Sequence, residues 1–207
     1  GSGTTIENLE IRGTFNYGVT FGQRGGVLRG CRIDGGSDFS VYCPSALADA
    51  TIEHNVLIHP GRFGVACESG AAPVVERNSI IEVGDCGIFS SAASPVCRRN
   101  IIWGAANFGI ACFSTPVPTL ECNDVYASVN QNWAGCVQGA TDIEADPLFC
   151  DDGSYQLKPE SPCAPTGSCG GIGALGVCPR AQRRPRRCPG HAPPATGAAW
   201  FAPRGPR

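Results

Sequence analysis

The chain repeats one phrase every 22 to 24 residues, and this repeat strongly limits the folds open to it. Residues 74–89 (VVERNSIIEVGDCGIF) and 96–111 (VCRRNIIWGAANFGIA) align with Asn78 and Asn100 in the same position. That position, called the Asn position below, recurs at Leu9, Cys31, Asn55, Asn78, Asn100 and Asn123. Self-similarity with a period in the twenties is typical of a solenoid, in which each repeat is one turn and packs on its neighbours.

The local pattern within each repeat indicates strands. Alternation such as Cys86-Gly87-Ile88-Phe89-Ser90 has a period of two, and no stretch is long and periodic enough for a helix. Apolar side chains recur three residues before and two residues after the Asn position. A third apolar position lies eight residues after the second, at Val19, Val41, Val65, Ile88 and Ile110. Stacked turns would then place like residues above one another, roughly 4.8 Å apart, with inward Asn amides bonding backbone and one another.

An aromatic position lies two residues before the third apolar position, and a small residue separates the two. It is occupied by Tyr17, Phe39, Phe63, Cys86 and Phe108. We expect this aromatic column in the core rather than in a ligand site.

The phrase (apolar)-x-x-Asn-x-Ile, closed by Gly-Ile, resembles the repeat of right-handed parallel β-helix proteins of the pectin-lyase-like superfamily. The resemblance runs from about Thr5 to about Cys136 and implies an all-β solenoid of about six turns. It leaves activity open, because that fold hosts lyases, hydrolases, epimerases, adhesins and proteins of no assigned activity. The stretches DPLFC (146–150), YQLKP (155–159) and GIGALG (171–176) resemble the closing segment of many bacterial secreted β-helix-repeat proteins.

Three regions follow from these patterns. Residues 1–138 are expected to form the parallel β-helix turns, and residues 139–178 a cap over the unpaired rung at the end of the solenoid. The Asp151-Asp152 pair in that cap is interpreted as a solvated loop rather than a catalytic pair. Residues 179–207 are rich in Pro, Arg and Ala without periodicity, which predicts a disordered tail. The chain begins inside the repeat without Met, so we expect it to be part of a longer chain.

Cysteine and charge usage limit the compartment and the partners. Thirteen Cys, five of them in residues 136–178, predict disulfides and a secreted or cell-envelope location. Cys43, Cys67 and Cys112 share one position in the turns and are expected to be small buried residues, although Cys43 and Cys67 could be near enough to bond. Residues 1–178 hold nine basic against 18 acidic residues, which does not suit nucleic acid. No apolar run is long enough to span a membrane.

A candidate site lies on the arc between the second and third apolar positions. If the turns stack, five polar side chains could share one patch over three rungs: Asp38, His59, Arg62, Glu82 and Asp85. Carboxylates beside Arg and His suit a uronide lyase, where acids hold Ca²⁺, a base removes a proton and cations neutralise the sugar carboxylate. The same residues also suit a surface ion-pair network, which is the interpretation we favour.

The sequence therefore predicts a non-catalytic secreted or surface solenoid with a carbohydrate-binding or structural role and no cofactor. Two alternatives stay open: a polysaccharide lyase or hydrolase acting on uronic-acid polymers, the one case in which Ca²⁺ would be needed, and a spacer segment of a larger adhesin. The acid motifs of polygalacturonase-like enzymes match only at Asp151-Asp152, outside the turns, and the near-constant turn length leaves little chain to build a deep cleft.

Overall fold

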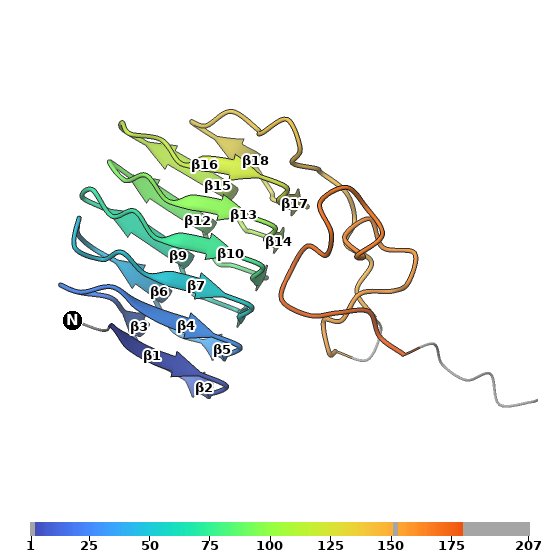
Figure 1. The fold of residues 1–207 in the computed structure, drawn as a ribbon, viewed down its shortest axis with the longest axis horizontal. Coiled ribbons are helices and arrows are strands. Elements are labelled where there is room, and N and C mark those ends of the chain that lie inside the picture. Colours follow the sequence, from blue (N-terminus) through green and yellow to red (C-terminus); the bar gives the residue numbers. More distant parts are fainter. Residues whose placement is uncertain (1–2, 151–152, 180–207) are drawn as a thin grey trace, which may run out of the picture.

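The protein is a coil of short β-strands wound into six turns, described for residues 3–150 and 153–179 in this computed structural model. Within these residues, each turn gives one strand to each of three parallel sheets, so strands three apart in sequence lie side by side (Figure 1). The described residues contain no helix, and accordingly none long and apolar enough to cross a membrane. The predicted all-β parallel solenoid of about six turns is confirmed.

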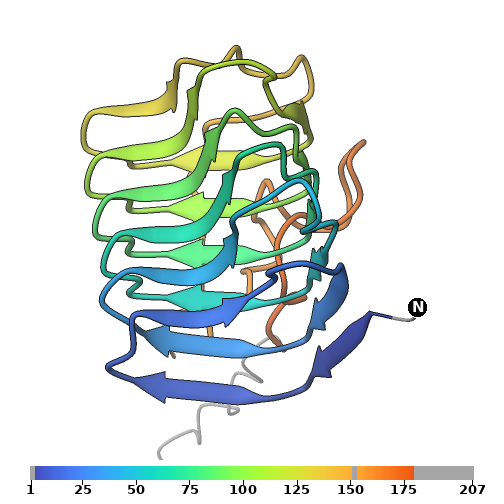
Figure 2. The ribbon, with the colours of Figure 1, turned by 90° about the vertical axis from the view of Figure 1, so that its left-hand side faces the viewer.

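The three sheets have the same strand order along the stack, seen from the side in Figure 2. Sheet A comprises β1 (Thr4–Glu7), β4 (Gly26–Arg29), β7 (Thr51–Glu53), β10 (Val74–Glu76), β13 (Val96–Arg98) and β16 (Thr119–Glu121). Sheet B comprises β2 (Glu10–Gly13), β5 (Arg32–Gly35), β8 (Val56–Ile58), β11 (Ser79–Ile81), β14 (Ile101–Trp103) and β17 (Asp124–Tyr126). Sheet C comprises β3 (Tyr17–Thr20), β6 (Phe39–Cys43), β9 (Phe63–Glu68), β12 (Cys86–Ser91), β15 (Phe108–Phe113) and β18 (Gln131–Ala134).

The Asn position forms one continuous interior ladder. Its amides donate in sequence from Asn55 Nδ2 to Asn78 Oδ1 (3.0 Å), from Asn78 to Asn100 (3.0 Å) and from Asn100 to Asn123 (2.9 Å). Asn123 Nδ2 then donates to Asp142 Oδ1 (3.0 Å), which ends the ladder. All four Asn are fully buried. Each amide also donates to a backbone carbonyl of the preceding turn, as Asn78 does to Ile52 (2.8 Å), so the bend between sheets A and B is satisfied internally.

The bend before each ladder residue is made by one residue in the left-handed backbone conformation. Asn8, Gly30, His54, Arg77, Arg99 and Cys122 all have φ between 53° and 61°. Side chains other than Gly adopt this conformation only at a cost. Backbone hydrogen bonds to the next turn oppose that cost, such as His54 N–H to Glu76 O (3.2 Å) and Arg77 N–H to Arg98 O (3.1 Å).

The segment predicted as a cap, residues 139–178, divides into two parts. Its beginning covers the last turn, where Ile143 bridges Asp124 in parallel and Asp142 completes the ladder. The remainder, which we call the strap (residues 146–150 and 153–178 of the described chain), lies beside the stack rather than beyond its end (Figure 1). The Asp151-Asp152 pair and the tail beyond residue 179 lie outside the described residues.

The strap covers an apolar strip on the outer face of sheet B. Interior side chains such as Leu57, Ile80 and Ile102 belong to the main core, while their neighbours along the strand belong to separate clusters with the strap. Those neighbours are Val56, Ile58, Ile81, Ile101 and Trp103, packed against Phe149, Tyr155, Leu157, Ile172 and Leu175. The outer face of β2 and β5 instead carries Glu10, Arg12, Arg32 and Asp34. Apolar residues therefore occupy both faces of sheet B only where the strap lies.

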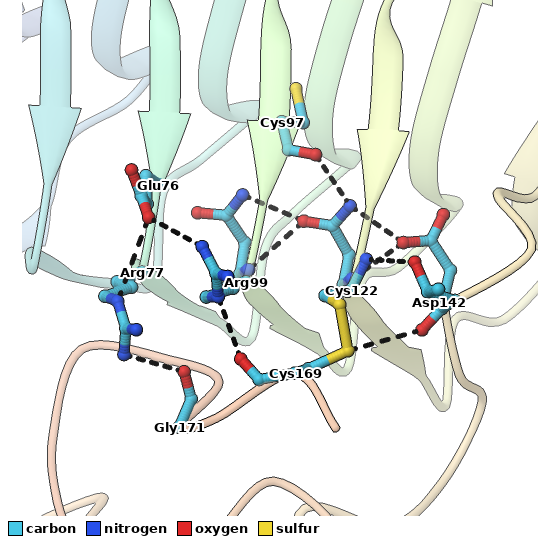
Figure 3. The surroundings of a disulfide bond; sticks show 11 residues. Glu76, Arg77, Cys97, Arg99, Cys122, Asp142, Cys169 and Gly171 are labelled. Carbon is cyan, nitrogen blue, oxygen red and sulfur yellow. Dashed lines mark hydrogen bonds and ion pairs between the residues drawn. A yellow bond between two sulfur atoms is a disulfide. The ribbon is translucent and has the colours of Figure 1, made fainter. Parts of the chain in front are cut away.

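Disulfides and hydrogen bonds fasten the strap (Figure 3). Cys122–Cys169 joins it to the bend before β17, and Cys150–Cys178 closes it on itself. Arg77 Nη1 donates to Gly171 O and Arg99 Nε to Cys169 O, both at 2.8 Å. The third disulfide in the described chain, Cys112–Cys136, corrects the expectation that Cys112 is a free buried residue. It links two turns through the interior at the end of the stack.

Candidate functional site

The aromatic column packs on the outer side of sheet C rather than in the main core, and there Phe39, Phe63 and Cys86 are buried in a cluster of their own, whereas Tyr17 is exposed. Val41 and Cys43 belong to the main core, so Tyr42 between them points outward. Phe39 stacks on Tyr42 with ring centroids 4.7 Å apart, and both belong to a cluster separate from the main core. Phe39 and Phe63 are nevertheless only 7% and 5% exposed, because neighbouring rings cover them.

These rings form a stack along the solenoid axis. Phe39 and Phe63 stack at 5.3 Å with an angle of 10° between their planes, and Phe63 and Phe89 at 4.6 Å with an angle of 9°. Tyr17 and Phe113 extend the stack at its two ends and are each 47% exposed. Stacked aromatic pairs add ~0.5–1.5 kcal/mol each beyond area burial, so the stack ties successive turns together as well as shaping the surface.

A groove of about 290 Å³ lies on this face, where the stack is interrupted. Cys86 occupies the position held by Phe63 on one side and Phe108 on the other, and Ala111 lies beside Phe89. Because these two small side chains stand among large ones, the surface is hollowed between them. The rings that line the groove are Phe39, Phe63, Phe89, Phe108 and Phe113.

Polar side chains line one edge of the groove, on the loops that lead from sheet B into sheet C. Arg62 Nη1 lies 3.3 Å from Asp38 Oδ1, and its guanidinium lies 4.6 Å from the centroid of the Phe63 ring. On the next rungs, Asn107 Nδ2 donates to Asp85 Oδ1 (3.0 Å), and Asn130 Nδ2 donates to Asn107 Oδ1. A column of charge and amide groups therefore runs parallel to an apolar band.

His59 and Glu82 belong to a different array, at the ends of the sheet B strands. His59 Nε2 lies 2.8 Å from Glu82 Oε2, and His59 Nδ1 lies 3.1 Å from Asp34 Oδ1. The bond to Asp34, opposed by partial burial and supported by Glu82, raises the pKa of His59. An imidazole that donates from both nitrogens is protonated and has no lone pair with which to accept a proton. In this arrangement His59 is an ion-pair partner rather than a base.

The five predicted site residues thus divide into two arrays. Arg62 and Asp85 line the groove and Asp38 pairs with Arg62 beside it, while His59 and Glu82 lie on the sheet B side of the same loops. No side-chain hydrogen bond or ion pair connects the two arrays in the described chain. No group of three or more His, Cys, Asp or Glu placed to hold a metal ion occurs in that part of the chain either.

Sequence reasoning did not find the residues that complete the groove. Glu68 lies on its lining and accepts a hydrogen bond from the Tyr42 hydroxyl at 2.7 Å. Partial burial and that bond raise the pKa of Tyr42 to about 12. Phe89 and Phe113 also line the groove. The available signal was the alternation along β12 and β15, which places Phe89 and Phe113 on the side opposite the core residues Ile88 and Cys112.

A second hollow of about 430 Å³ lies where the strap meets sheet B. Trp103 and Tyr126 border it from neighbouring rungs, and Phe149 and Tyr155 border it from the strap. The Phe149 ring meets both Trp103 and Tyr155 edge to face, at 6.0 and 5.7 Å. These contacts join the strap to the solenoid, and the hollow lies beside the packed rings.

Comparison with known families gives one result. A family model described as "Right handed beta helix region" matches residues 1–145, which include all eighteen strands of the described chain. No curated protein and no solved structure matches the chain.

Proposed function

Because the chain belongs to the right-handed β-helix family, we propose that it is a non-catalytic solenoid that binds a polymeric carbohydrate along the outer face of sheet C. The observation that carries this proposal is the groove itself, an apolar floor bordered on one side by Arg62, Asp85 and Asn107. A sugar ring presents an apolar C–H face together with hydroxyl groups, and small-molecule sites typically combine apolar surface with a few directed polar groups.

The repetition of the solenoid favours a polymer over a single sugar. The polar column offers one group per rung, with rungs roughly 4.8 Å apart, and the aromatic stack runs beside it over the same turns. A ligand that repeats along its length can meet equivalent groups on successive rungs. The shallow groove also suits a chain lying on the surface better than a reaction sealed from water.

The lyase or hydrolase alternative and the spacer alternative stay predictions. The contacts of His59 disfavour the enzyme, because its two nitrogens are both held by carboxylates. A spacer would show neither sugar binding nor sugar release.

Three disulfides in the described chain support a location outside the reducing cytosol. We therefore place the protein among secreted or cell-envelope proteins, where polysaccharides are available to bind. The family match does not itself assign that location.

Affinity electrophoresis in gels containing a panel of plant and bacterial polysaccharides tests the proposal. We expect the wild-type chain to be retarded by at least one acidic or neutral polymer. Asp85→Ala and Phe108→Ala should each weaken retardation at least about tenfold, since one removes a polar contact and the other a wall of the groove. Glu121→Ala, on the exposed face of sheet A, is the matched control and should bind as wild type.

Two outcomes would contradict the groove assignment. Unretarded wild-type protein across the panel would remove carbohydrate binding altogether. Binding that survives in Asp85→Ala and Phe108→Ala but is lost in Trp103→Ala would move the site to the hollow beside the strap. The same samples assayed for release of reducing or unsaturated sugar separate binding from catalysis.

A further inference from the structure

One interior column of sheet C contains cysteine in three of its turns. Phe21, Cys43, Cys67, Ser90 and Cys112 occupy equivalent positions, and Cys112 is joined to Cys136 of the next turn. The two Cα atoms of that disulfide lie 5.4 Å apart, and 24 residues separate the cysteines. At this end of the solenoid a bond therefore passes from the column to the next turn, to a cysteine offset by one residue from direct register.

Cys43 and Cys67 lie in this column on the second and third turns, in direct register rather than offset by one residue as Cys112 and Cys136 are. They are direct register partners on β6 and β9, and both are fully buried in the main core. They are also 24 residues apart. Partners on adjacent strands lie about 4.8 Å apart, within the roughly 4.4–6.8 Å between Cα atoms that disulfides require. The structure holds both as thiols, and a hydrogen bond between the two thiols and burial raise the pKa of Cys67.

We propose that Cys43 and Cys67 form a fourth disulfide that joins the second turn to the third. The other free cysteines of the described chain occupy other positions in the turns or the strap. The Cys31 thiol contacts the carbonyls of Ile6 and Arg29, Cys86 points to the outer face of sheet C, and Cys163 contacts Asp124. Cys97 is buried on sheet A, at the position equivalent to Val75 and Leu120. Among the free cysteines of the described residues, only Cys43 and Cys67 are register partners.

The bond requires a disulfide oxidant, such as oxidised glutathione or a disulfide-exchange protein of the extracytoplasmic compartment. The thiolate of one cysteine attacks the oxidant and releases one reduced thiol. The second cysteine, as its thiolate, then attacks the mixed disulfide and releases the other. Two protein thiols and one oxidant disulfide thus become one protein disulfide and two reduced thiols. Because neither side chain is exposed in the fold and the pKa of Cys67 is raised, exchange belongs to the stage before the turns close.

Such a bond would fasten a part of the solenoid in which the described residues form no other disulfide. The three disulfides of the described chain all lie between residues 112 and 178. A bond between β6 and β9 would join the second turn, whose outer sheet B face is polar, to the third, whose outer face is apolar and packs against the strap.

Peptide mapping of the full chain tests the proposal. The protein is refolded from the reduced state in a glutathione redox buffer, alkylated without reduction, and digested with trypsin. Cys43 is the sole cysteine in residues 33–62 and Cys67 in residues 63–77, and these stretches end at Arg62 and Arg77. We expect these two peptides to be recovered as one disulfide-linked species. Recovery of both as alkylated peptides, or linkage of either to a different cysteine, would overturn the proposal.

Thermal unfolding of the variants gives an independent answer. If the bond forms, Cys43→Ala, Cys67→Ala and the double variant should show the same loss of Tm, roughly 5–10 °C, because either change removes the whole cross-link. Losses that add up in the double variant would instead show two separate packing contributions and no bond. Cys97→Ala, another buried thiol, is the matched control and should leave the linked peptide intact.

Discussion

The outer face of sheet B is polar in the first two turns, where Arg32 lies over the ring of Tyr155 from the strap, whereas in turns three to five it is apolar and buried beneath the strap. Glu10, Arg12 and Asp34 occupy that face in the first region, and Ile58, Ile81 and Trp103 in the second. The same backbone coil accommodates both surfaces, because only the outward residues differ. The repeated coil therefore sets the shape of the molecule, while the outward side chains of sheet B determine which turns pack against the strap.

The two regions also differ in the residues at the Asn position and in their disulfides. The Asn ladder begins at Asn55, so the first two turns have Leu9 and Cys31 in place of an amide. Every disulfide of the described structure lies between residues 112 and 178. Local stability in a folded chain follows such differences in contacts. We therefore expect the early turns to open more readily than the later ones.

The largest effect should come from releasing the strap. A variant that combines Cys122→Ser with Cys169→Ser removes a cross-link across 47 residues, which corresponds to about 4 kcal/mol in the free energy of unfolding. Urea unfolding of the variant and the wild type measures this loss. Because the bond acts on the covered turns, hydrogen exchange should quicken in β11 and β14 and change little in β2. Equal quickening in all turns would contradict the division into two regions.

A smaller effect should come from Asp124, a fully buried carboxyl between the last turn and the strap. It accepts hydrogen bonds from the Cys163 thiol (2.9 Å) and from Ala145 N–H (3.0 Å), and burial raises its pKa from 3.8 to about 6. Between these values the folded state keeps a proton that the unfolded state has released. This contribution to stability is therefore complete below pH ~4 and is lost as the pH rises through ~6.

Urea unfolding of the wild type and Asp124→Asn at several pH values isolates that contribution. The wild type should lose up to ~3 kcal/mol more than the variant between pH 4 and pH 7, since one pKa unit corresponds to about 1.4 kcal/mol. The two proteins share all other titrating groups, so the difference between their slopes reports on Asp124. Parallel pH profiles would show that this carboxyl has its ordinary pKa in the fold.

The smallest effect should come from extending the Asn ladder into the second turn. Cys31 N–H already donates to Asn55 Oδ1 (2.9 Å), and the Cys31 thiol lies 3.8 Å from Ile6 O, the carbonyl equivalent to the one each ladder amide uses. Cys31→Asn should therefore add two amide hydrogen bonds and raise the free energy of unfolding by ~1 kcal/mol. Cys31→Ala is the control, because it removes the thiol without adding an amide. A variant no more stable than that control would show that the second turn cannot accept the amide.

The interior of the fold could be predicted from the sequence because each inward position repeats. The ladder residues Asn55, Asn78, Asn100 and Asn123 and the apolar positions around them recur at nearly constant spacing, and stacking alone then places them in register. The direction of the aromatic column was not fixed by spacing. Regular alternation would place Phe63 and Val65 on the same face of the strand. The pairing is interrupted at Gly64, and Phe63 packs outside while Val65 packs in the main core.

The sequence contains an indication of the strap that the repeat period does not show. Val56-Leu57-Ile58 and Ile101-Ile102-Trp103 are continuous apolar runs, which are typical of strands covered on both faces. The runs show that a cover exists, but they do not identify the segment that supplies it. The candidate site was predicted in part for a similar reason. Asp38, Arg62 and Asp85 follow the repeat, while the groove arises where Cys86 and Ala111 break the pattern of large side chains.

Hydrogen exchange of the native chain, followed by mass spectrometry, tests the central comparison most directly. The account predicts that the amides of β8, β11 and β14, beneath the strap, exchange at least ~100-fold more slowly than those of β2 and β5, because opening them requires the strap to detach. Equal protection of β5 and β11, two interior strands of the same sheet, would contradict it and show that the strap adds nothing to the turns it covers.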